Sequence, residues 1–166
     1  PFDITADITN VAVNKLFYAF DNFGLQVLDD KNLKGRFSAT ARLRGNITDK
    51  GTLLPHSTRG FVDFSLQNGE LINFEPLLKI SKFAFKKRNL SHVVFKDISN
   101  RLDIEGDKVI IHPMTISSSA LYIDIKGVYG FTAGTDIAMA IPLRNPAKDG
   151  FDVNEDIIPR SERKKK

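Results

Sequence analysis

The sequence contains no cysteine and only three histidines among its 166 residues. The absence of cysteine excludes a disulfide scaffold and a zinc site with thiolate ligands. No apolar run approaches the roughly 18 residues that a membrane-spanning helix needs, and no signal peptide is recognisable. We therefore expect any membrane anchor to lie outside these residues. The chain begins at Pro1 rather than at a methionine, which predicts a processed or excised fragment.

The common catalytic and nucleotide-binding motifs are also missing. The sequence has no G-x-S-x-G, no Walker-type loop and no G-x-G-x-x-G. None of His56, His92 and His112 stands three or four residues from a second ligand in a way that suggests a metal site. Asp29-Asp30 lies in a turn-rich segment, and Ser117–Ser119 has no nearby base. We therefore expect no catalytic residue, no metal and no cofactor, and an enzyme is the least favoured class.

The formal net charge of +4 comes from the end of the chain rather than from its body. Five basic residues and one acidic residue stand in the last seven positions, and the rest of the chain has 19 basic and 19 acidic residues. A domain that binds nucleic acid normally carries a basic stripe on its folded surface. The sequence therefore predicts no nucleic-acid partner.

The clearest pattern in the chain is RFSATARLRGNIT, residues 36–48. Apolar or small side chains occupy every second position from Phe37 to Ile47, with mostly polar side chains between them. Such alternation predicts a long strand with one dry and one solvated face. The same period recurs in residues 3–8 and 60–67, and from Val93 onward in RLDIEGDKVIIHPMTI, ALYIDIKGVYG and TDIAMAIPL. We expect roughly eight antiparallel strands.

Two segments change to helical spacing. Apolar residues recur every three or four positions within residues 12–23, which predicts a helix that ends near Gly24. Residues 75–84 predict a second short helix, with Asn73 as its N-cap and Pro76 in its first turn. The basic cluster Lys86, Lys87 and Arg88 follows this helix. It could complement the helix dipole, which we favour, or contact a lipid headgroup or an anionic membrane surface.

Turns are indicated at three places. Asn68-Gly69 predicts a hairpin between strand 60–67 and a short return strand at Leu71-Ile72. Gly106-Asp107 predicts a second hairpin. Residues 48–60, with Gly51 and Pro55, predict a loop.

The order of these elements resembles the C-terminal region of AsmA-like proteins, and the version typical of Bacteroidota is the most similar. The resemblance is carried by LQNGELINFEPLLKISKF, by Val93, Phe95 and Ile98 at a strand start, and by PMTISSSAL from Pro113. The segment KLFYAFDNFG from Lys15 looks like the part that precedes this block. The resemblance covers nearly all of residues 1–145. It carries no catalytic signature.

AsmA-like proteins are anchored in the inner membrane of Gram-negative bacteria by an N-terminal helix and extend into the periplasm. The family is associated with phospholipid movement and outer-membrane biogenesis, and a long curved sheet forms a trough lined by apolar side chains. The resemblance therefore implies a mainly β domain over residues 1–145, with a groove-like antiparallel sheet partly covered by two helices. Residues 146–166 are expected to form a flexible basic tail.

We expect the apolar concave face to hold phospholipid acyl chains. The lipid-facing candidates are Phe37, Leu43, Ile47, Val62, Phe64, Leu66, Leu121, Ile123, Ile125, Ile137, Met139 and Ile141. The headgroup or membrane-surface candidates are Lys86, Lys87 and Arg88. The alternative is a non-catalytic structural or interaction module with an ordinary dry core, in which edge strand 135–143 or 36–48 pairs with a partner or with an adjoining segment of the same protein.

Overall fold

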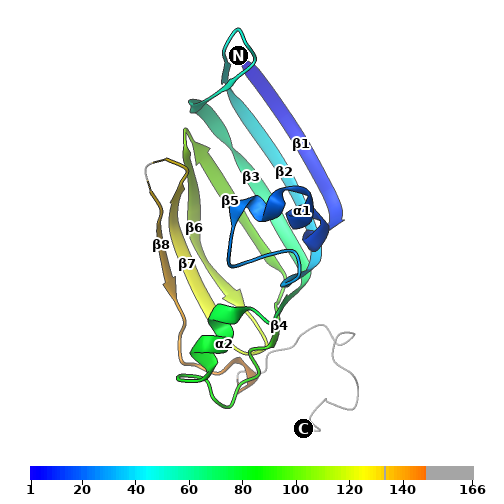
Figure 1. Cartoon of the computed structure of the whole chain (residues 1–166), viewed down its shortest axis with the longest axis vertical. Coiled ribbons are helices and arrows are strands. Elements are labelled where there is room, and N and C mark those ends of the chain that lie inside the picture. The colour runs from blue at the N-terminus through cyan, green and yellow to red at the C-terminus, as the bar shows by residue number, and fades with distance from the viewer. Residues whose placement is uncertain (133, 149–166) are drawn as a thin grey trace.

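One antiparallel sheet of eight strands dominates the computed structural model, which describes residues 1–132 and 134–148 (Figure 1). The strands are β1 (Phe2–Ala12), β2 (Leu33–Ile47), β3 (Leu53–Ile72), β4 (His92–Val94), β5 (Ile98–Glu105), β6 (Lys108–Ser117), β7 (Tyr122–Gly130) and β8 (Asp136–Ala140). Their order is β1-β2-β3-β5-β6-β7-β8, and β4 pairs with the end of β3. Because β1 and β8 are separate edges, the sheet is open. The prediction of a long, mainly antiparallel β fold is confirmed.

The strand register places the alternating apolar residues on one face. One row crosses seven strands through hydrogen-bonded neighbours. Its members are Ala6, Ala41, Val62, Leu102, Ile111, Gly127 and Ile137. Side chains one position away on each strand point to the opposite face, because the period of a strand is two. The sheet therefore has one apolar face and one mostly polar face.

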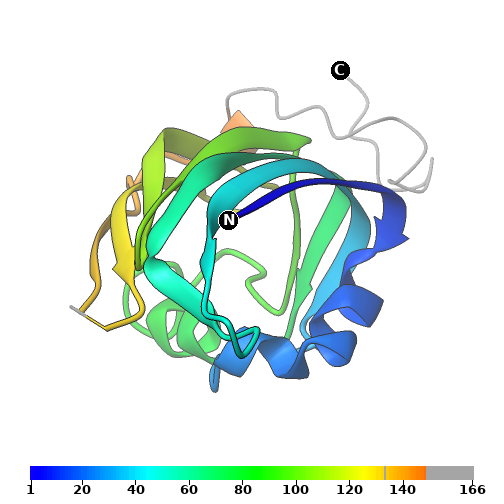
Figure 2. The same ribbon diagram turned by 90° about the horizontal axis from the view of Figure 1, so that it is seen from above.

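The sheet curls about the long axis of the molecule, with the helices on its concave side (Figure 2). Two glycines bring neighbouring strands close together on this sheet. A Cβ atom on Gly60 would collide with the carbonyl oxygen of Arg42, and one on Gly127 would collide with that of Asp136. Their φ angles of +156° and +145° are ones that L side chains rarely adopt. Glycine inside a strand commonly marks such a bend or close backbone approach.

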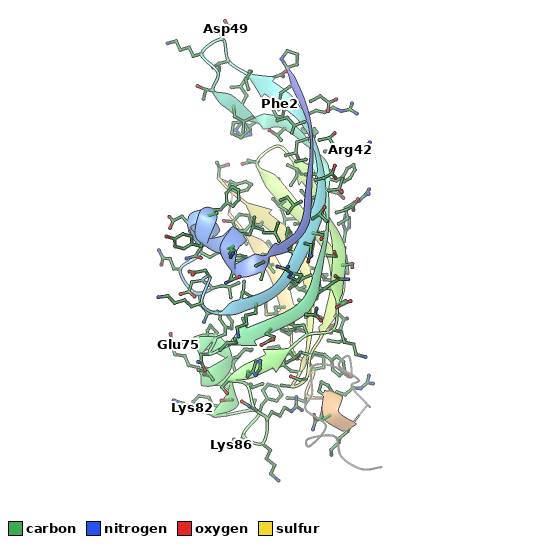
Figure 3. All side chains as sticks on the ribbon, turned by 90° about the vertical axis from the view of Figure 1, so that its right-hand side faces the viewer. Phe2, Arg42, Asp49, Glu75, Lys82 and Lys86 are labelled. Atoms are coloured by element: carbon green, nitrogen blue, oxygen red, sulfur yellow. The ribbon has the colours of Figure 1, made fainter. Side chains whose placement is uncertain are left out.

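The helices are shorter than predicted. The segment 12–23 divides into α1 (Val13–Ala19) and the 3₁₀ helix η1 (Asp21–Gly24), because Asp21 and Asn22 take positive φ angles of 49° and 51°. The second helix, α2 (Glu75–Ser81), has Pro76 in its first turn as expected, but Phe74 rather than Asn73 is the residue before it. Seen from the side, both α helices lie on the concave side of the sheet (Figure 3).

The predicted hairpin at Asn68-Gly69 is wrong. Strand β3 continues through both residues to Ile72. Asn68 adopts a φ of 51°, and the pairing with β2 shifts between Arg36–Gln67 and Lys34–Glu70, so two residues of β3 oppose the single Gly35. This is a β-bulge, which uses the same left-handed conformation that a tight hairpin turn would need. Beyond it, β3 leaves β5 and pairs with β4.

The other two turn predictions had different outcomes. The hairpin at Gly106-Asp107 is confirmed, because β5 ends at Glu105 and β6 starts at Lys108. The loop predicted for residues 48–60 is mostly wrong, since β3 already starts at Leu53. The long stretch between the two strands therefore shortens to residues 48–52.

The hydrophobic core lies at one end of the trough, under α2. Its buried members are Leu71, Leu77, Phe85, Leu90, Val93, Phe95, Ala120 and Leu121. An isolated bridge between Phe95 and Ser118 ties together the two segments that close this end. Pro146, in the short 3₁₀ helix η2 (Pro146–Lys148), is also fully buried. The rest of the predicted basic tail, residues 149–166, lies outside the described residues.

Candidate functional site: the inner face of the sheet

The apolar face on the concave side of the sheet, called the inner face below, is the main candidate site. It is defined by Phe2, Ile4, Ala6, Ile8, Phe37, Ala39, Ala41, Leu43, Val62, Phe64, Leu66, Ile98, Asn100, Leu102, Ile104, Val109, Ile111, Met114, Ile116, Ile123, Ile125, Tyr129, Ile137 and Met139. No member of this set is charged. The amide of Asn100 is held by the backbone carbonyl of His112 at 3.3 Å.

The inner face is covered at one end and open over the rest of its length. At the covered end, Val93 and Leu121 have no exposed surface. Along the middle of the sheet, side chains such as Val62, Leu102 and Ile111 are only half-buried. Toward the edges, Ile4 is 50% exposed and Met139 is 60% exposed. A dry core would have buried these side chains, so the helices seal only part of the apolar surface.

Eight of the twelve predicted lipid-facing residues lie on the open part of the inner face, outside the core. They are Phe37, Leu43, Val62, Phe64, Leu66, Ile125, Ile137 and Met139. The rings of Phe37 and Phe64 stack at 6.2 Å between centroids, on adjacent strands. A cleft of about 470 Å³ across β6, β7 and β8 is lined by residues of both faces, such as Ile125 and Met139 of the inner face and Asp124 and Lys126 of the outer face.

The other four predicted residues have different positions. Leu121 is a wrong prediction: it is fully buried in the core and precedes β7, so it faces no open surface. Its backbone carbonyl accepts a hydrogen bond from the Ser118 hydroxyl, which fixes the turn. Ile123 lies on the inner face at its covered end, where both it and Ile141 pack against the core beneath α2. Ile47 pairs with Leu53 at the tip of the β2–β3 hairpin and is 46% exposed.

Several inner-face residues were not among the candidates, although the sequence carries a signal for them. Leu102, Ile104, Val109 and Ile111 alternate within the predicted hairpin around Gly106. The register brings them into line with the candidates of β3 and β7. Their period-two spacing indicates a common face, but only the pairing of β5 with β3 shows which face that is.

Two of the three predicted headgroup residues are exposed, and the third is half-buried and bound to backbone carbonyl oxygens. Lys86 and Lys87 are exposed. Arg88 is half-buried, and its guanidinium donates hydrogen bonds to the carbonyl oxygens of Ala120 at 3.0 Å and Leu143 at 2.6 Å. The same group lies 4.5 Å from the Phe85 ring centroid. These contacts give Arg88 a role in fastening the chain, and its assignment as a headgroup ligand stays a prediction.

The outer face carries ion pairs between neighbouring strands. Arg101 binds both carboxylate oxygens of Asp63 at 2.7 Å and lies 4.1 Å from the Phe61 ring centroid. The hydrogen bond from Arg101 holds the pKa of the Asp63 carboxyl below its usual range. Exposed pairs of this kind contribute little stability individually.

Each histidine lies near one carboxylate that is nine or more residues away in the sequence. His92 Nε2 is 2.7 Å from Glu70 Oε2, and His112 Nε2 is 2.5 Å from Asp103 Oδ2. His56 is 4.0 Å from Asp107. Within residues 1–132 and 134–148, no three histidine or acidic side chains gather in a way that could hold a metal ion.

Of the two segments predicted as edge strands, one lies inside the sheet and the other forms an edge. Segment 36–48 is wrong as an edge, because β2 pairs with β1 on one side and β3 on the other. Residues 136–140 form β8, which is an edge, and β1 is the opposite one. The mistake arose because period-two alternation reports the faces of a strand but not its neighbours.

No helix in the described part of the chain is long and apolar enough to cross a membrane. No protein-family model matches the chain, and neither a curated protein nor a solved structure matches it significantly. The choice among functions therefore depends on the geometry and chemistry of the inner face.

Proposed function

We propose that this chain is a periplasmic β-groove segment of an AsmA-like protein anchored in the inner membrane, and that its inner face holds phospholipid acyl chains. The observation that carries the proposal is the unbroken apolar row from Ala6 to Ile137, which the helices leave partly exposed. Its role in the cell would be phospholipid transport toward the outer membrane and outer-membrane biogenesis. This role and the location rest on the resemblance of the sequence.

The chemistry of the inner face suits an acyl chain. Each methylene group transferred from water to an apolar surface gains about 0.8 kcal/mol. None of the inner-face side chains is charged, so no ion has to be dehydrated when an acyl chain lies against Val62 or Leu102. Phospholipid would bind by passive partitioning, with the headgroup in water and the tails free to slide along the face.

The dimensions agree with this mode of binding. An eight-residue strand such as β5 spans about 26 Å. One acyl chain spans about half of the roughly 30 Å hydrocarbon core of a bilayer. The inner face is therefore long enough for an extended acyl chain without help from the sealed core.

Photo-crosslinking from paired positions tests the proposal. We would place a photoreactive side chain at Leu43 and at Arg42, and in a second pair at Ile125 and at Lys126. The members of each pair are adjacent on one strand and point to opposite faces. With long-chain phosphatidylglycerol, we expect crosslinks from Leu43 and Ile125 and a background level from Arg42 and Lys126.

Native mass spectrometry of the same protein, purified without detergent, should detect bound phospholipid. Equal crosslinking from both faces, or lipid-free protein with no crosslink from either inner position, would contradict the proposal.

A structural or interaction module is the second candidate, favoured by the two open edges. Strand β1 has eleven residues, most of them exposed, and all five residues of β8 are exposed. Such edges can add a strand from a neighbour. Size-exclusion chromatography with light scattering would reveal oligomers of the chain. Oligomers that dissociate when Ile137 is replaced by proline, without any bound lipid, would favour this module over lipid binding.

A further inference from the structure

The segment Lys82–Lys87, called the basic tip below, forms one end of the molecule. In Figure 3, Lys82 and Lys86 lie at the end opposite Asp49, beyond α2. Phe83 projects from this segment and is 84% exposed, more than any other large hydrophobic side chain among the described residues. An exposed phenylalanine flanked by lysines combines an apolar ring with positive charge, which is the composition of protein surfaces that lie at a membrane interface.

The local charge is of one sign. Between Glu75 and Asp97 the sequence has six lysines and arginines and no acidic residue. Lys79 pairs with Glu75 at 2.8 Å, and Arg88 binds backbone carbonyls. The lysines of the basic tip, Lys82, Lys86 and Lys87, remain exposed, and their side-chain ammonium groups have no hydrogen bond or ion pair with another described residue. The basic tip is thus a positive patch on a chain whose body is neutral overall.

The basic tip is fastened to the folded body from beneath. Phe85, two residues after Phe83, is 5% exposed and belongs to the core. Arg88 lies against the Phe85 ring and bonds to the carbonyl oxygens of Ala120 and Leu143. Leu143, held at this contact, is itself 73% exposed. The fold therefore keeps Phe83 outward while it buries the next aromatic side chain.

The dipole of α2 does not account for the basic tip. This helix ends at Ser81, and the field of a helix end falls off within the last turn. Lys82 is close enough to interact favourably with the negative end of the helix dipole, but Lys86 and Lys87 are several residues beyond the end of the helix. The dipole also gives no reason for an exposed Phe83. The helix dipole therefore leaves Phe83, Lys86 and Lys87 unexplained.

We propose that the basic tip docks onto an anionic lipid bilayer surface, with Phe83 inserted at the level of the headgroups. Lysines near such a surface gain electrostatic energy, and an aromatic side chain at the interface adds apolar contact. This docking goes beyond acyl-chain binding on the inner face and does not require it. It would hold the covered end of the trough against the membrane.

Vesicle co-sedimentation of the full chain tests the docking. Vesicles of phosphatidylcholine alone are compared with vesicles that also contain phosphatidylglycerol. The end of the chain carries its own basic residues, so all variants are made in a background with Arg163→Ser, Lys164→Ser, Lys165→Ser and Lys166→Ser. One variant carries Lys86→Glu and Lys87→Glu, and another carries Phe83→Ser. The matched control carries Lys50→Glu and Lys126→Glu, which make the same charge change away from the basic tip.

We expect binding to the anionic vesicles only. Each lysine near the surface contributes a factor of about five in affinity, so the double charge reversal should lower it at least about 25-fold. Phe83→Ser should lower it about fivefold or more. The control should bind like its parent, and high salt should release the parent. Urea unfolding of each variant establishes that it is folded.

Three results would overturn the docking: equal binding to both kinds of vesicle, unchanged binding after the substitutions at the basic tip, or an equal loss in the control. Crosslinking of dispersed lipid from Leu43 is measured in the same variants. If that crosslink is absent while docking depends on the basic tip, only the acyl-chain proposal fails. If the crosslink persists without docking, only the docking fails.

Discussion

At the scale of single residues, two glycines allow the sheet to take its shape. Gly60 and Gly127 stand where a neighbouring backbone comes too close for any Cβ atom. Gly127 also belongs to the apolar row that crosses the sheet, so its position helps to determine the curvature of the inner face. A side chain there would have to move a whole strand rather than a flexible neighbour.

Replacement of Gly127 by alanine should therefore lower the free energy of unfolding by about 2–4 kcal/mol, through an unfavourable φ and a backbone collision. Gly51→Ala is the matched control, because Gly51 also has a positive φ of 79° but nothing within 4 Å of the added methyl group. It should cost only about 1 kcal/mol. Urea denaturation compares the two variants. Equal losses would show that the close approach of β7 and β8 is absent.

The pair Asp63–Arg101 makes stability depend on pH in a defined direction. The hydrogen bond from Arg101 lowers the pKa of Asp63 in the folded protein. A carboxyl with a lowered folded pKa stabilises the fold above its unfolded pKa, near 4, and loses this contribution as the pH falls through the folded value. Hydrogen bonding by Thr132 lowers the pKa of Asp107 in the same direction.

We expect Asp63→Asn to be less stable than the parent at pH 7 and to differ from it progressively less below pH 4. Urea midpoints measured from pH 7 to pH 2 would show this convergence. Because the pair is exposed, the difference should be small. A constant difference across the whole pH range would contradict the assigned role of the Arg101 contact.

At the scale of elements, strand β3 decides how the two ends of the trough are joined. Its centre pairs with β2 and β5, and its end beyond Asn68 pairs with β2 and β4. The bulge at Asn68-Gly69 allows this change of neighbour without breaking the strand. The sheet thereby continues from its open part into the core under α2.

Engineered disulfides can test the continuity of β3 cleanly, since the chain has no native cysteine. Lys34 and Glu70 are register partners across β2 and β3, so Lys34→Cys with Glu70→Cys should oxidise readily. Gln67→Cys with Glu70→Cys is the matched control, because these residues would face each other only in a hairpin at Asn68-Gly69. Gel mobility without reductant reports both. If the control pair formed its disulfide faster, the result would contradict the bulge and support a hairpin at Asn68-Gly69.

At the scale of the whole molecule, stability should vary across the sheet. The covered end contains Val93 and Leu121 with no exposed surface, whereas β8 is exposed along its whole length. An open trough with one sealed end has most of its tertiary packing at that end. The edge strands lack a partner on one side, so they can open without disturbing the centre.

The rates of amide hydrogen exchange should reflect this decrease in local stability from the centre of the sheet to its edges. Amides of residues 62–66 in β3, which has strands on both sides, should exchange only through openings close to global unfolding. Amides of residues 136–140 should exchange through local openings of much lower free energy. Exchange detected by mass spectrometry or NMR reports both segments. Uniform protection from centre to edge would indicate that β8 is covered in solution.

The candidate site was predictable to the extent that it depends on local pattern. Alternation alone placed Leu43, Val62 and Ile125 each on the apolar side of its own strand, because side-chain direction within a strand depends only on position parity. It could not identify Leu121 as core, because that burial comes from segments far away in the sequence. The contacts of Arg88 with Ala120 and Leu143 could not be predicted either, because they also join segments that are far apart in the sequence.

The sequence by itself determined the strand-rich character of this protein, the two-faced strands and the approximate positions of both helices. These properties arise from backbone preferences and from spacing within a few residues. Only the tertiary structure decided that Asn68-Gly69 forms a bulge, that β2 lies inside the sheet and that the apolar face remains partly open. Those outcomes depend on pairings between distant segments, such as Leu33 with Leu71, whose energies no local pattern contains.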